Sequence, residues 1–169
     1  MIVISKHILS VLVENQPGVL SKVSGLFSRR GYNIDSLTVG ITEDNTISRM
    51  TIVLDGDAYI LEQISKQLNK LIDVIKIIEL EPGKSVLREL ALIKVTSDVN
   101  IKTSITETVN IFRGNIIDLD INSMTIEITG DEQKIDAFIN LMKPYGIKEI
   151  IRTGLTALER GNKSIEIKQ

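Results

Sequence analysis

Two similar stretches of this sequence limit the possible folds more than any other feature. RGYNID at residues 30–35 is followed 83 residues later by RGNIID at residues 113–118. Around each stretch, some segments have apolar residues at every second position, as in strands, and others have them at helical spacing. The order of these segments is strand, helix, strand, strand, helix, strand. A chain of 169 residues is long enough for two small cores. The sequence therefore predicts an α+β protein made of two tandem ferredoxin-like βαββαβ domains.

The first domain is predicted at residues 1–82. Its expected strands are 7–14, 37–41, 50–54 and 72–80, and its expected helices are 17–30 and 57–68. Pro17 suits the first position of a helix because its missing N–H needs no partner there. Gly31 stands where a helix often ends in a left-handed residue, and Asp57 is a candidate N-cap.

Residues 83–87 have the composition of a linker, and the second domain is predicted at residues 88–169. Its expected strands are 90–96, 115–121, 123–129 and 146–152, and its expected helices are 101–112 and 131–142. After Thr153 the periodicity is weak, which indicates a short helix followed by a frayed end.

Composition excludes several classes of function. The net charge is −2 and the 20 basic residues are scattered, which argues against a nucleic-acid or membrane-surface partner. There is no cysteine and one histidine, His7, so thiol chemistry and zinc binding are not expected. Asp118, Asp120 and Glu127 alternate with apolar residues, as on a solvated sheet face, and no catalytic motif is present. We expect a cytoplasmic protein that is not an enzyme, without a metal site or a signal peptide.

The best candidate for a binding site is the turn that leads into the first helix. The turn and helix start comprise Asn15, Gln16, Pro17, Gly18, Val19 and Leu20. Free N–H groups at a helix start suit a carboxylate, and Val19 and Leu20 suit a short aliphatic chain. An ordinary strand-to-helix turn would explain the same residues.

Asn33 and Ile34, just past the other end of this helix, favour the binding interpretation. Tyr32 and Ile34 are expected to pack while Asn33 points elsewhere, and a side-chain amide suits an ammonium or a carboxylate. The second repeat has residues 98–101, DVNI, in place of NQPG and Ile116 in place of Asn33. These features together describe an amino-acid site that the second domain lacks, which leaves the second domain for protein contact.

One ligand cannot reach both asparagines within one chain. A helix of about 14 residues separates them by roughly 20 Å. If two copies pair about a two-fold axis with their first helices antiparallel, Asn15 of one copy meets Asn33 of the other. The sequence therefore predicts a homodimer with two sites at its interface.

The sequence resembles a known family at these residues. The strand followed by N-x-P-G-V-L is typical of ACT domains. LSVLVENQPGVL, LFSRRGYNIDSLTVG, SRMTI and IFRGNIIDL together resemble the small regulatory subunit of acetohydroxyacid (acetolactate) synthase over nearly the whole chain. The resemblance identifies the first domain as an ACT domain and implies effector contacts at residues 15–20, with Asn33 and Ile34 supplied by the partner chain.

The resemblance also implies a role. It describes a non-catalytic subunit that activates a catalytic large subunit and confers feedback inhibition by valine or another branched-chain amino acid. No cofactor is expected in this chain; thiamine diphosphate, magnesium and FAD are expected in the catalytic subunit.

Three other functions remain to be weighed. The main alternative is an ACT-type module that dimerises without binding a metabolite. An RNA binder of this fold needs aromatic residues on strands 37–41 and 50–54, which contain none. A metal-sensing regulator needs several histidines or cysteines, and the chain has one histidine.

Overall fold

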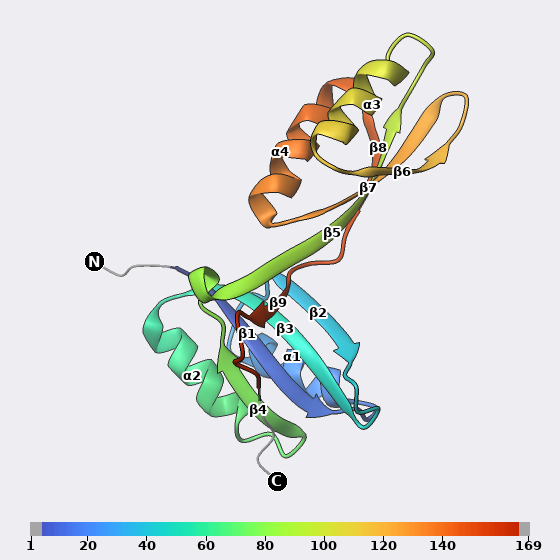
Figure 1. The fold of residues 1–169 in the computed structure, drawn as a ribbon. Coiled ribbons are helices and arrows are strands. Elements are labelled where there is room, and N and C mark those ends of the chain that lie inside the picture. The colour runs from blue at the N-terminus through green and yellow to red at the C-terminus, as the bar shows by residue number, and fades with distance from the viewer. Residues whose placement is uncertain (1–4, 166–169) are drawn as a thin grey trace. The chain divides into compact units, whose positions relative to one another are not determined.

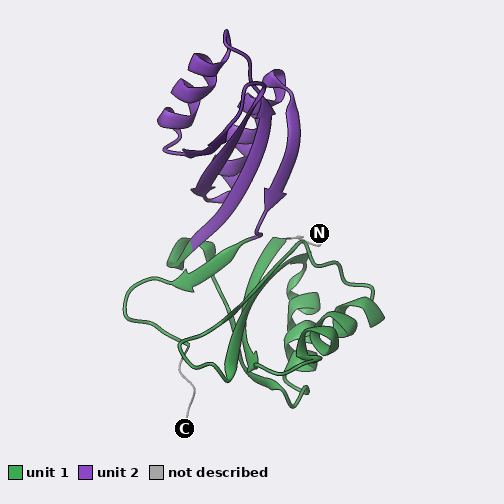
Figure 2. Cartoon of the chain, turned by 90° about the vertical axis from the view of Figure 1, so that its right-hand side faces the viewer, with its two compact units in different colours: residues 1–86, 155–169 green, residues 87–154 purple. Residues whose placement is uncertain are grey.

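The computed structural model describes residues 5–165 and divides the chain into two compact units (Figures 1 and 2). Unit 1 comprises Met1–Val86 together with Leu155–Gln169, and unit 2 comprises Leu87–Gly154. This division differs from the predicted boundaries, which assigned all of residues 88–169 to the second domain. The chain returns to unit 1 after Gly154, and residues 166–169, the end of the predicted tail, lie outside the described residues.

Unit 1 has the predicted βαββαβ order. Its elements are β1 (Ser5–Glu14), α1 (Val19–Arg29), β2 (Ser36–Ile41), β3 (Ile47–Gly56), α2 (Ala58–Leu68) and β4 (Val74–Glu79). The strands form an antiparallel sheet in the order β2-β3-β1-β4. This order is that of a ferredoxin-like sheet, so the predicted fold class is confirmed.

The core of unit 1 lies between the sheet and its two helices. Alternate residues of the central strands face the helices, and the register pairs Leu9 with Ile52 and Val11 with Met50. Phe27 of α1 is 1% exposed in the same cluster. The apolar side chains at every second strand position therefore pack against the apolar side chains on one face of each helix, and together they form one buried layer.

The face of this sheet that points away from the helices is covered by the segments in which the chain enters and leaves the second repeat. Ile8, Leu12 and Val53 point away from the core and yet are at most 4% exposed. β9 (Thr156–Glu159) pairs with β5 (Ser85–Thr96), and Ala157 of β9 is 3% exposed. The short helix expected after Thr153 is therefore wrong, because this segment is a strand held by pairing with a distant part of the chain.

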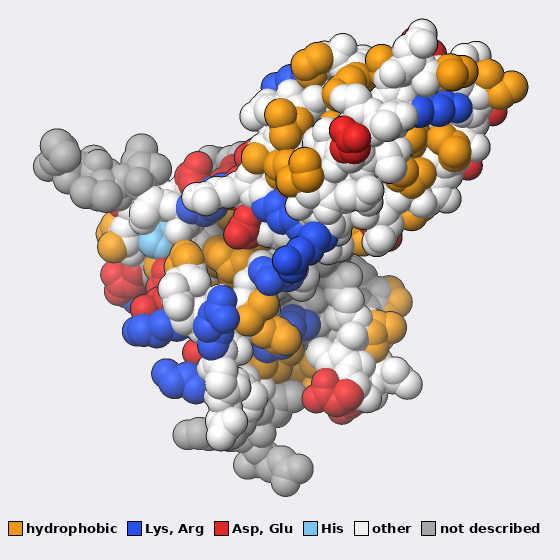
Figure 3. All heavy atoms as spheres, turned by 45° about the horizontal axis from the view of Figure 1, so that its top comes forward, with side chains coloured by type: hydrophobic (Ala, Val, Ile, Leu, Met, Phe, Trp, Pro, Cys, Tyr) orange, Lys and Arg blue, Asp and Glu red, His pale blue; other side chains and the backbone are white. Residues whose placement is uncertain are grey.

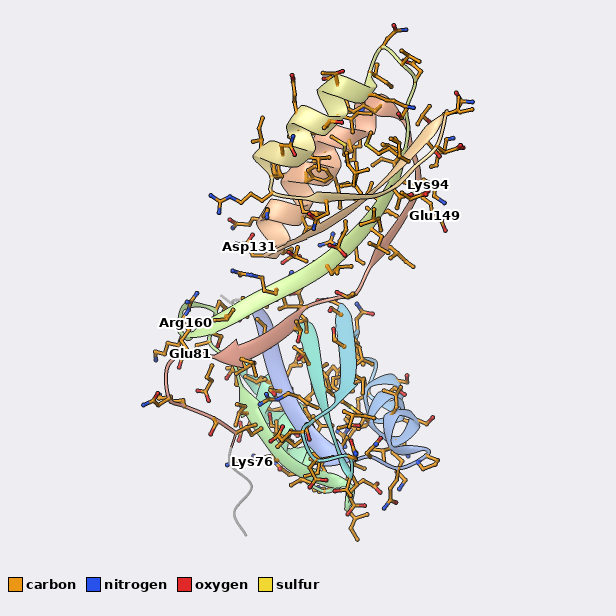
Figure 4. All side chains as sticks on the ribbon, turned by 45° about the vertical axis from the view of Figure 1, so that its right-hand side comes forward. Lys76, Glu81, Lys94, Asp131, Glu149 and Arg160 are labelled. Atoms are coloured by element: carbon orange, nitrogen blue, oxygen red, sulfur yellow. The ribbon has the colours of Figure 1, made fainter. Side chains whose placement is uncertain are left out.

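Hydrogen bonds hold this returning segment on unit 1. The backbone N–H of Leu155 donates to Oγ of Ser36 at 2.8 Å, and Oγ1 of Thr38 donates to the Leu155 carbonyl at 3.0 Å. Arg160, labelled in Figure 4, donates through Nε to the carbonyl of Ser85 at 3.1 Å. The predicted linker at 83–87 accordingly contains ordered structure, a 3-10 turn at Pro82–Lys84 and the start of β5.

Unit 2 repeats the pattern of unit 1. Its elements after β5 are α3 (Lys102–Ile111), β6 (Asn115–Leu119), β7 (Ser123–Gly130), α4 (Glu132–Met142), a 3-10 turn (Lys143–Tyr145) and β8 (Ile147–Arg152). The strand order β6-β7-β5-β8 matches that of unit 1. Ile93, Ile105 and Phe138 are fully buried in its core, and the rings of Phe112 and Phe138 meet edge to face at 5.3 Å.

The predicted N-cap of α2, Asp57, is confirmed, and Asp131 caps α4 in the same way. Asp57 accepts a hydrogen bond from the backbone N–H of Ile60 at 2.8 Å, and Asp131, labelled in Figure 4, accepts one from Lys134 at 2.9 Å. Gly31 has φ 69°, the left-handed conformation expected after α1.

The first helix begins later than predicted. α1 starts at Val19 instead of Pro17, because Gly18 has φ 87° and its backbone is not helical. At the corresponding end of α3 the left-handed residue is Arg113, with φ 54°, one position earlier than Gly114. A Cβ on Gly114 would lie 3.1 Å from the carbonyl oxygen of Glu127, so a glycine is needed there for close approach.

Candidate ligand-binding site

The turn between β1 and α1 presents an exposed, uncapped helix start. Residues 15–18 are exposed, while Val19 is buried and Leu20 is 45% exposed. No side chain caps α1, and the N–H groups of Leu20 and Ser21 have no backbone acceptor among the described residues. Such N–H groups carry the positive end of the helix dipole. The turn can therefore offer hydrogen-bond donors to a carboxylate.

Gly18 shapes this turn through its backbone. Its φ of 87° is the left-handed conformation that side-chain-bearing residues adopt only with strain. A Cβ placed on it would meet nothing within 4 Å, so the space beside it is open. Gly18 thus allows the chain to turn sharply and keeps the approach to the helix start clear.

The side chain of Asn15 is fixed by two hydrogen bonds. Its Nδ2 donates to the carbonyl oxygen of Asn45 at 2.8 Å, and its Oδ1 accepts from Oγ of Ser48 at 3.1 Å. Its backbone N–H donates to the carbonyl of Thr46 at 2.7 Å. One N–H of the amide and one lone pair of its oxygen remain for a ligand.

Asn45 and Ser48 are partners that the sequence interpretation missed. Both lie on the β2–β3 hairpin, at least 30 residues beyond Asn15 in the chain. The antiparallel register, which pairs Glu14 with Ile47, brings them together. Nothing local in the sequence signals this contact.

A second support of the turn is the ion pair between Lys22 and Asp73. Nζ of Lys22 lies 2.7 Å from Oδ2 of Asp73, a residue that is 6% exposed. The backbone carbonyl of Asp73 also accepts from the N–H of Glu14 at 2.9 Å. The start of α1 is thereby tied both to the end of β1 and to the segment before β4.

The other end of α1 presents Asn33 as predicted. Asn33 is exposed, while its neighbours Tyr32 and Ile34 are partly buried against the core of unit 1. Nδ2 of Asn33 donates to Oδ1 of Asp35 at 2.8 Å, which orients the amide. Its oxygen and its second N–H have no partner among the described residues and stay available.

The structure brings residues 15–20 together and leaves Asn33 and Ile34 at the opposite end of α1. The helix has 11 residues. At about 1.5 Å per residue it spans roughly 16 Å, too far for one small ligand to touch both ends. Each chain therefore carries two halves of the predicted site, and neither is complete by itself.

The corresponding turn of unit 2 is held by a side chain of its own. Oδ1 of Asp98 accepts from the N–H of Asn100 at 2.7 Å and from that of Ile101 at 3.2 Å. In unit 1 the position of Asn100 is taken by Pro17, which has no N–H. No side chain caps either helix, so the two turns differ in their residues and not in an open helix start.

No group of three or more His, Asp or Glu side chains among residues 5–165 is placed to hold a metal ion. None of the described helices is long and apolar enough to cross a membrane.

Comparison with protein families gives two matches that together span most of the chain. Residues 9–76 match the model described as the AHAS small subunit-like ACT domain, and residues 88–161 match the model described as the small subunit of acetolactate synthase. The second match includes β9, the strand that returns to unit 1.

Individual proteins with these names are similar over almost their full length. The probable acetolactate synthase small subunit of Archaeoglobus fulgidus is 56% identical over 158 residues, covering 94% of this chain and 99% of that protein. The acetolactate synthase small subunit of Mycolicibacterium smegmatis is 54% identical over 159 residues, covering 94% of each. The crystal structure of the small subunit from Thermotoga maritima superposes with a TM-score of 0.89 at 46% identity, covering 94% of this chain and 99% of that one.

Proposed function

Because this chain belongs to the family of acetolactate synthase small subunits, we propose that it is the regulatory partner of a catalytic subunit and that it binds valine at a homodimer interface. The observation that carries the ligand proposal is the separation of two oriented asparagines by the length of α1. Asn15 stands beside an uncapped helix start, and Asn33 stands at the other end. A two-fold pairing of α1 with its copy would join these halves into two equivalent sites.

The chemistry of the joined halves suits a branched-chain amino acid. The N–H groups at the start of α1 are donors for its carboxylate, and the oxygen of Asn33 is an acceptor for its ammonium. Leu20, exposed by 45%, and the half-buried Ile34 offer apolar contacts of the size of an isopropyl group. Valine binding would then favour the dimer and any state of it that the catalytic subunit distinguishes.

The edge of the first sheet supports pairing of two copies. β2 is an edge strand, and no strand among residues 5–165 pairs with its outer side. Val39 and Ile41 on this strand are 43% and 60% exposed. An unprotected apolar edge of this kind favours pairing with a second strand. The variant Ile41→Lys should shift the protein toward monomer in sedimentation, whereas Ile72→Lys, at a residue 91% exposed outside the strands, should not.

Mixed dimers test the shared site directly. Asn15→Ala and Asn33→Ala homodimers should each bind valine about tenfold more weakly or worse, by the loss of a hydrogen bond to a charged group. A heterodimer of the two variants contains one site with both asparagines intact. An equal mixture that exchanges subunits should therefore regain about a quarter of the wild-type sites in calorimetry. No regain would place both asparagines of a site in one chain and overturn the proposal.

The contact with the catalytic subunit is proposed for unit 2. Large apolar side chains are exposed on and after its edge strand β6, with Ile117 at 51%, Leu119 at 58% and Ile121 at 75%. Figure 3 shows hydrophobic side chains on the surface of the protein. Exposed apolar clusters of this kind are typical of protein contact surfaces. Leu119→Lys should abolish activation of the catalytic subunit while valine binding persists. Loss of valine binding in the same variant would contradict this division of roles.

The alternative function is a dimerising assembly module that binds no metabolite. The hydrogen bonds of Asn15 to Asn45 and Ser48 favour this alternative in part, because they give the residue a structural role without any ligand. Calorimetry separates the two functions. A homodimer that shows neither heat nor thermal stabilisation with millimolar valine would support the assembly module.

A further inference from the structure

A cavity lies within unit 1, on the face of the first sheet opposite its helices. It has a volume of about 640 Å³ and is lined by the β2–β3 turn, by the sheet and by the returning C-terminal segment. In Figure 4 the chain after Arg160 runs beside β4, on which Lys76 is labelled. The volume falls within the range of sites for small molecules. None of the residues of the predicted effector site lines this cavity.

Arg49 is the polar centre of the cavity. It lies on β3 opposite Leu12 and is half-buried. Its Nε is fully buried and makes no hydrogen bond to any described residue. Burial lowers the pKa of Arg49, and the charges of Glu43 and Glu159 oppose that shift. Because Nε is closed to a solvent-sized molecule, an acceptor in the cavity would meet the guanidinium at its other N–H groups.

Two carboxylates face this arginine without binding it. Glu43 and Glu159 line the same cavity and act on the charge of Arg49, yet neither forms an ion pair within 4 Å with any described residue. Asp44 and Lys163 also line the cavity, so its wall carries two cationic and three acidic side chains. A simple anion would be attracted by the cations and repelled by the carboxylates. A molecule with a carboxylate and a cationic group satisfies both kinds of charge.

Five aliphatic side chains also line the cavity. The apolar lining residues are Leu12, Ile47, Ile78, Leu158 and Ile165. They come from β1, β3, β4, β9 and the segment after it, so the apolar wall surrounds the charged group on several sides. An aliphatic side chain of a ligand would lose contact with water against this wall.

We propose that this cavity is a second binding site, which takes a small aliphatic α-amino acid with its carboxylate on Arg49 and its ammonium toward Glu43 and Glu159. The planar guanidinium matches a carboxylate in a bidentate geometry. This site is distinct from the interface site and does not depend on dimerisation, because all of its residues belong to unit 1 of one chain.

The β2–β3 turn connects this cavity with the start of α1. Thr42 and Glu43 of the turn line the cavity, as does Ile47 at the start of β3, and the carbonyl of Asn45 in the same turn accepts the hydrogen bond from Asn15. An occupant of the cavity therefore touches the element that orients Asn15. If the turn has two conformations that the ligands distinguish, binding in the cavity changes the affinity of the interface site. Binding at the interface site then changes the affinity of the cavity by the same factor.

Methyl NMR on the full chain can observe the two sites separately. With isoleucine δ-methyl labelling, Ile47 and Ile78 report on the cavity and Ile34 reports on the interface site. Leucine should shift the Ile47 and Ile78 signals in a saturable way, both in the wild type and in Asn33→Ala. The 2-oxo acid of leucine, which lacks the ammonium, should bind the cavity at least tenfold more weakly. Absence of saturation by leucine, or equal binding of the two compounds, would overturn the proposal.

Two variants assign the charges. Arg49→Met should weaken the cavity response to leucine at least tenfold without lowering the melting temperature, because a partly buried charge gives way to an apolar side chain of similar length. Glu159→Gln should lower the affinity of the cavity for leucine and leave its affinity for the 2-oxo acid at the wild-type value or above it. A cavity response that persists in Arg49→Met, or an equal loss of both compounds in Glu159→Gln, would refute the assignment even if one variant folds poorly.

Discussion

The amide of Asn15 donates to the carbonyl oxygen of Asn45 across 2.8 Å and so binds the start of the α1 turn to the β2–β3 hairpin. Asn15→Ala removes this bond and the one from Ser48, which is 6% exposed. We expect a loss of about 1–2 kcal/mol in the free energy of unfolding, together with weaker valine binding. Asn33→Ala removes only an exposed bond to Asp35 and should change stability by less than about 0.5 kcal/mol. Urea titration of both variants makes the comparison; equal losses would contradict it.

Gly18 and Gly25 lie seven positions apart and should respond to alanine in opposite ways. Gly18 has φ 87°, so Gly18→Ala should destabilise unit 1 by about 1 kcal/mol and displace the start of α1. Gly25 lies within α1, and a Cβ there would meet nothing closer than Arg29 at 4.0 Å. Gly25→Ala should therefore stabilise by about 0.5–1 kcal/mol. Thermal unfolding measures both, and the same sign for the two variants would be inconsistent with this structure.

The turn of the β2–β3 hairpin should carry an acid-dependent part of the stability. The Thr46 hydroxyl, at 2.6 Å from Oδ1 of Asp44, and the Thr46 backbone N–H, at 2.8 Å, lower the pKa of that carboxyl. A lowered folded-state pKa gives stability that is present above the unfolded-state value, about 3.9, and is lost as the pH falls through the folded-state value.

The variant Asp44→Asn should therefore melt below the wild type at pH 7 and approach it as the pH falls below about 3. Thr46→Val removes the hydroxyl bond and should reduce the same pH dependence. Melting temperatures of the three proteins across this range make the measurement. A constant difference between Asp44→Asn and the wild type at every pH would show that the carboxylate charge is not involved.

The return of the chain to unit 1 can be tested at Ala157. Ala157 is 3% exposed, and Leu155, two positions earlier, is hydrogen bonded to Ser36 and Thr38 of β2. Ala157→Asp buries a carboxylate without a partner and should destabilise unit 1 by about 3 kcal/mol or more. Thr156→Asp changes the neighbouring exposed residue of β9 and should alter stability by less than about 1 kcal/mol. Hydrogen exchange of the β1 amides distinguishes two effects. Faster exchange in β1 indicates that all of unit 1 is destabilised, whereas unchanged exchange indicates a local effect on the C-terminal segment.

Local pattern was sufficient for most of the fold. The strand around Val11 and the helix around Phe27 follow from apolar spacing, and Asp57 caps the helix that it was predicted to cap. The start of α1 was predicted two residues early, because Pro17 is compatible with a first helical turn and only the conformation of Gly18 excludes it.

The C-terminal strand could not be predicted from its own residues. β9 is the four-residue sequence TALE, in which Ala157, Leu158 and Glu159 favour a helix when considered locally. Pairing with β5, about 70 positions earlier, overrides that preference. The cavity beside Arg49 escaped the sequence interpretation for the same reason, since one of its walls exists only where the chain returns.

The sheet that is synthesised first is covered by residues that are synthesised last. β1 and β3 of unit 1 leave the ribosome long before β9, so Ile8 and Val53 stay open to water and to other chains until Ala157 arrives. All of Leu87–Gly154 must be made in the interval. The nascent chain thus passes through a stage with one apolar sheet face uncovered, when it is most exposed to aggregation and to capture by chaperones.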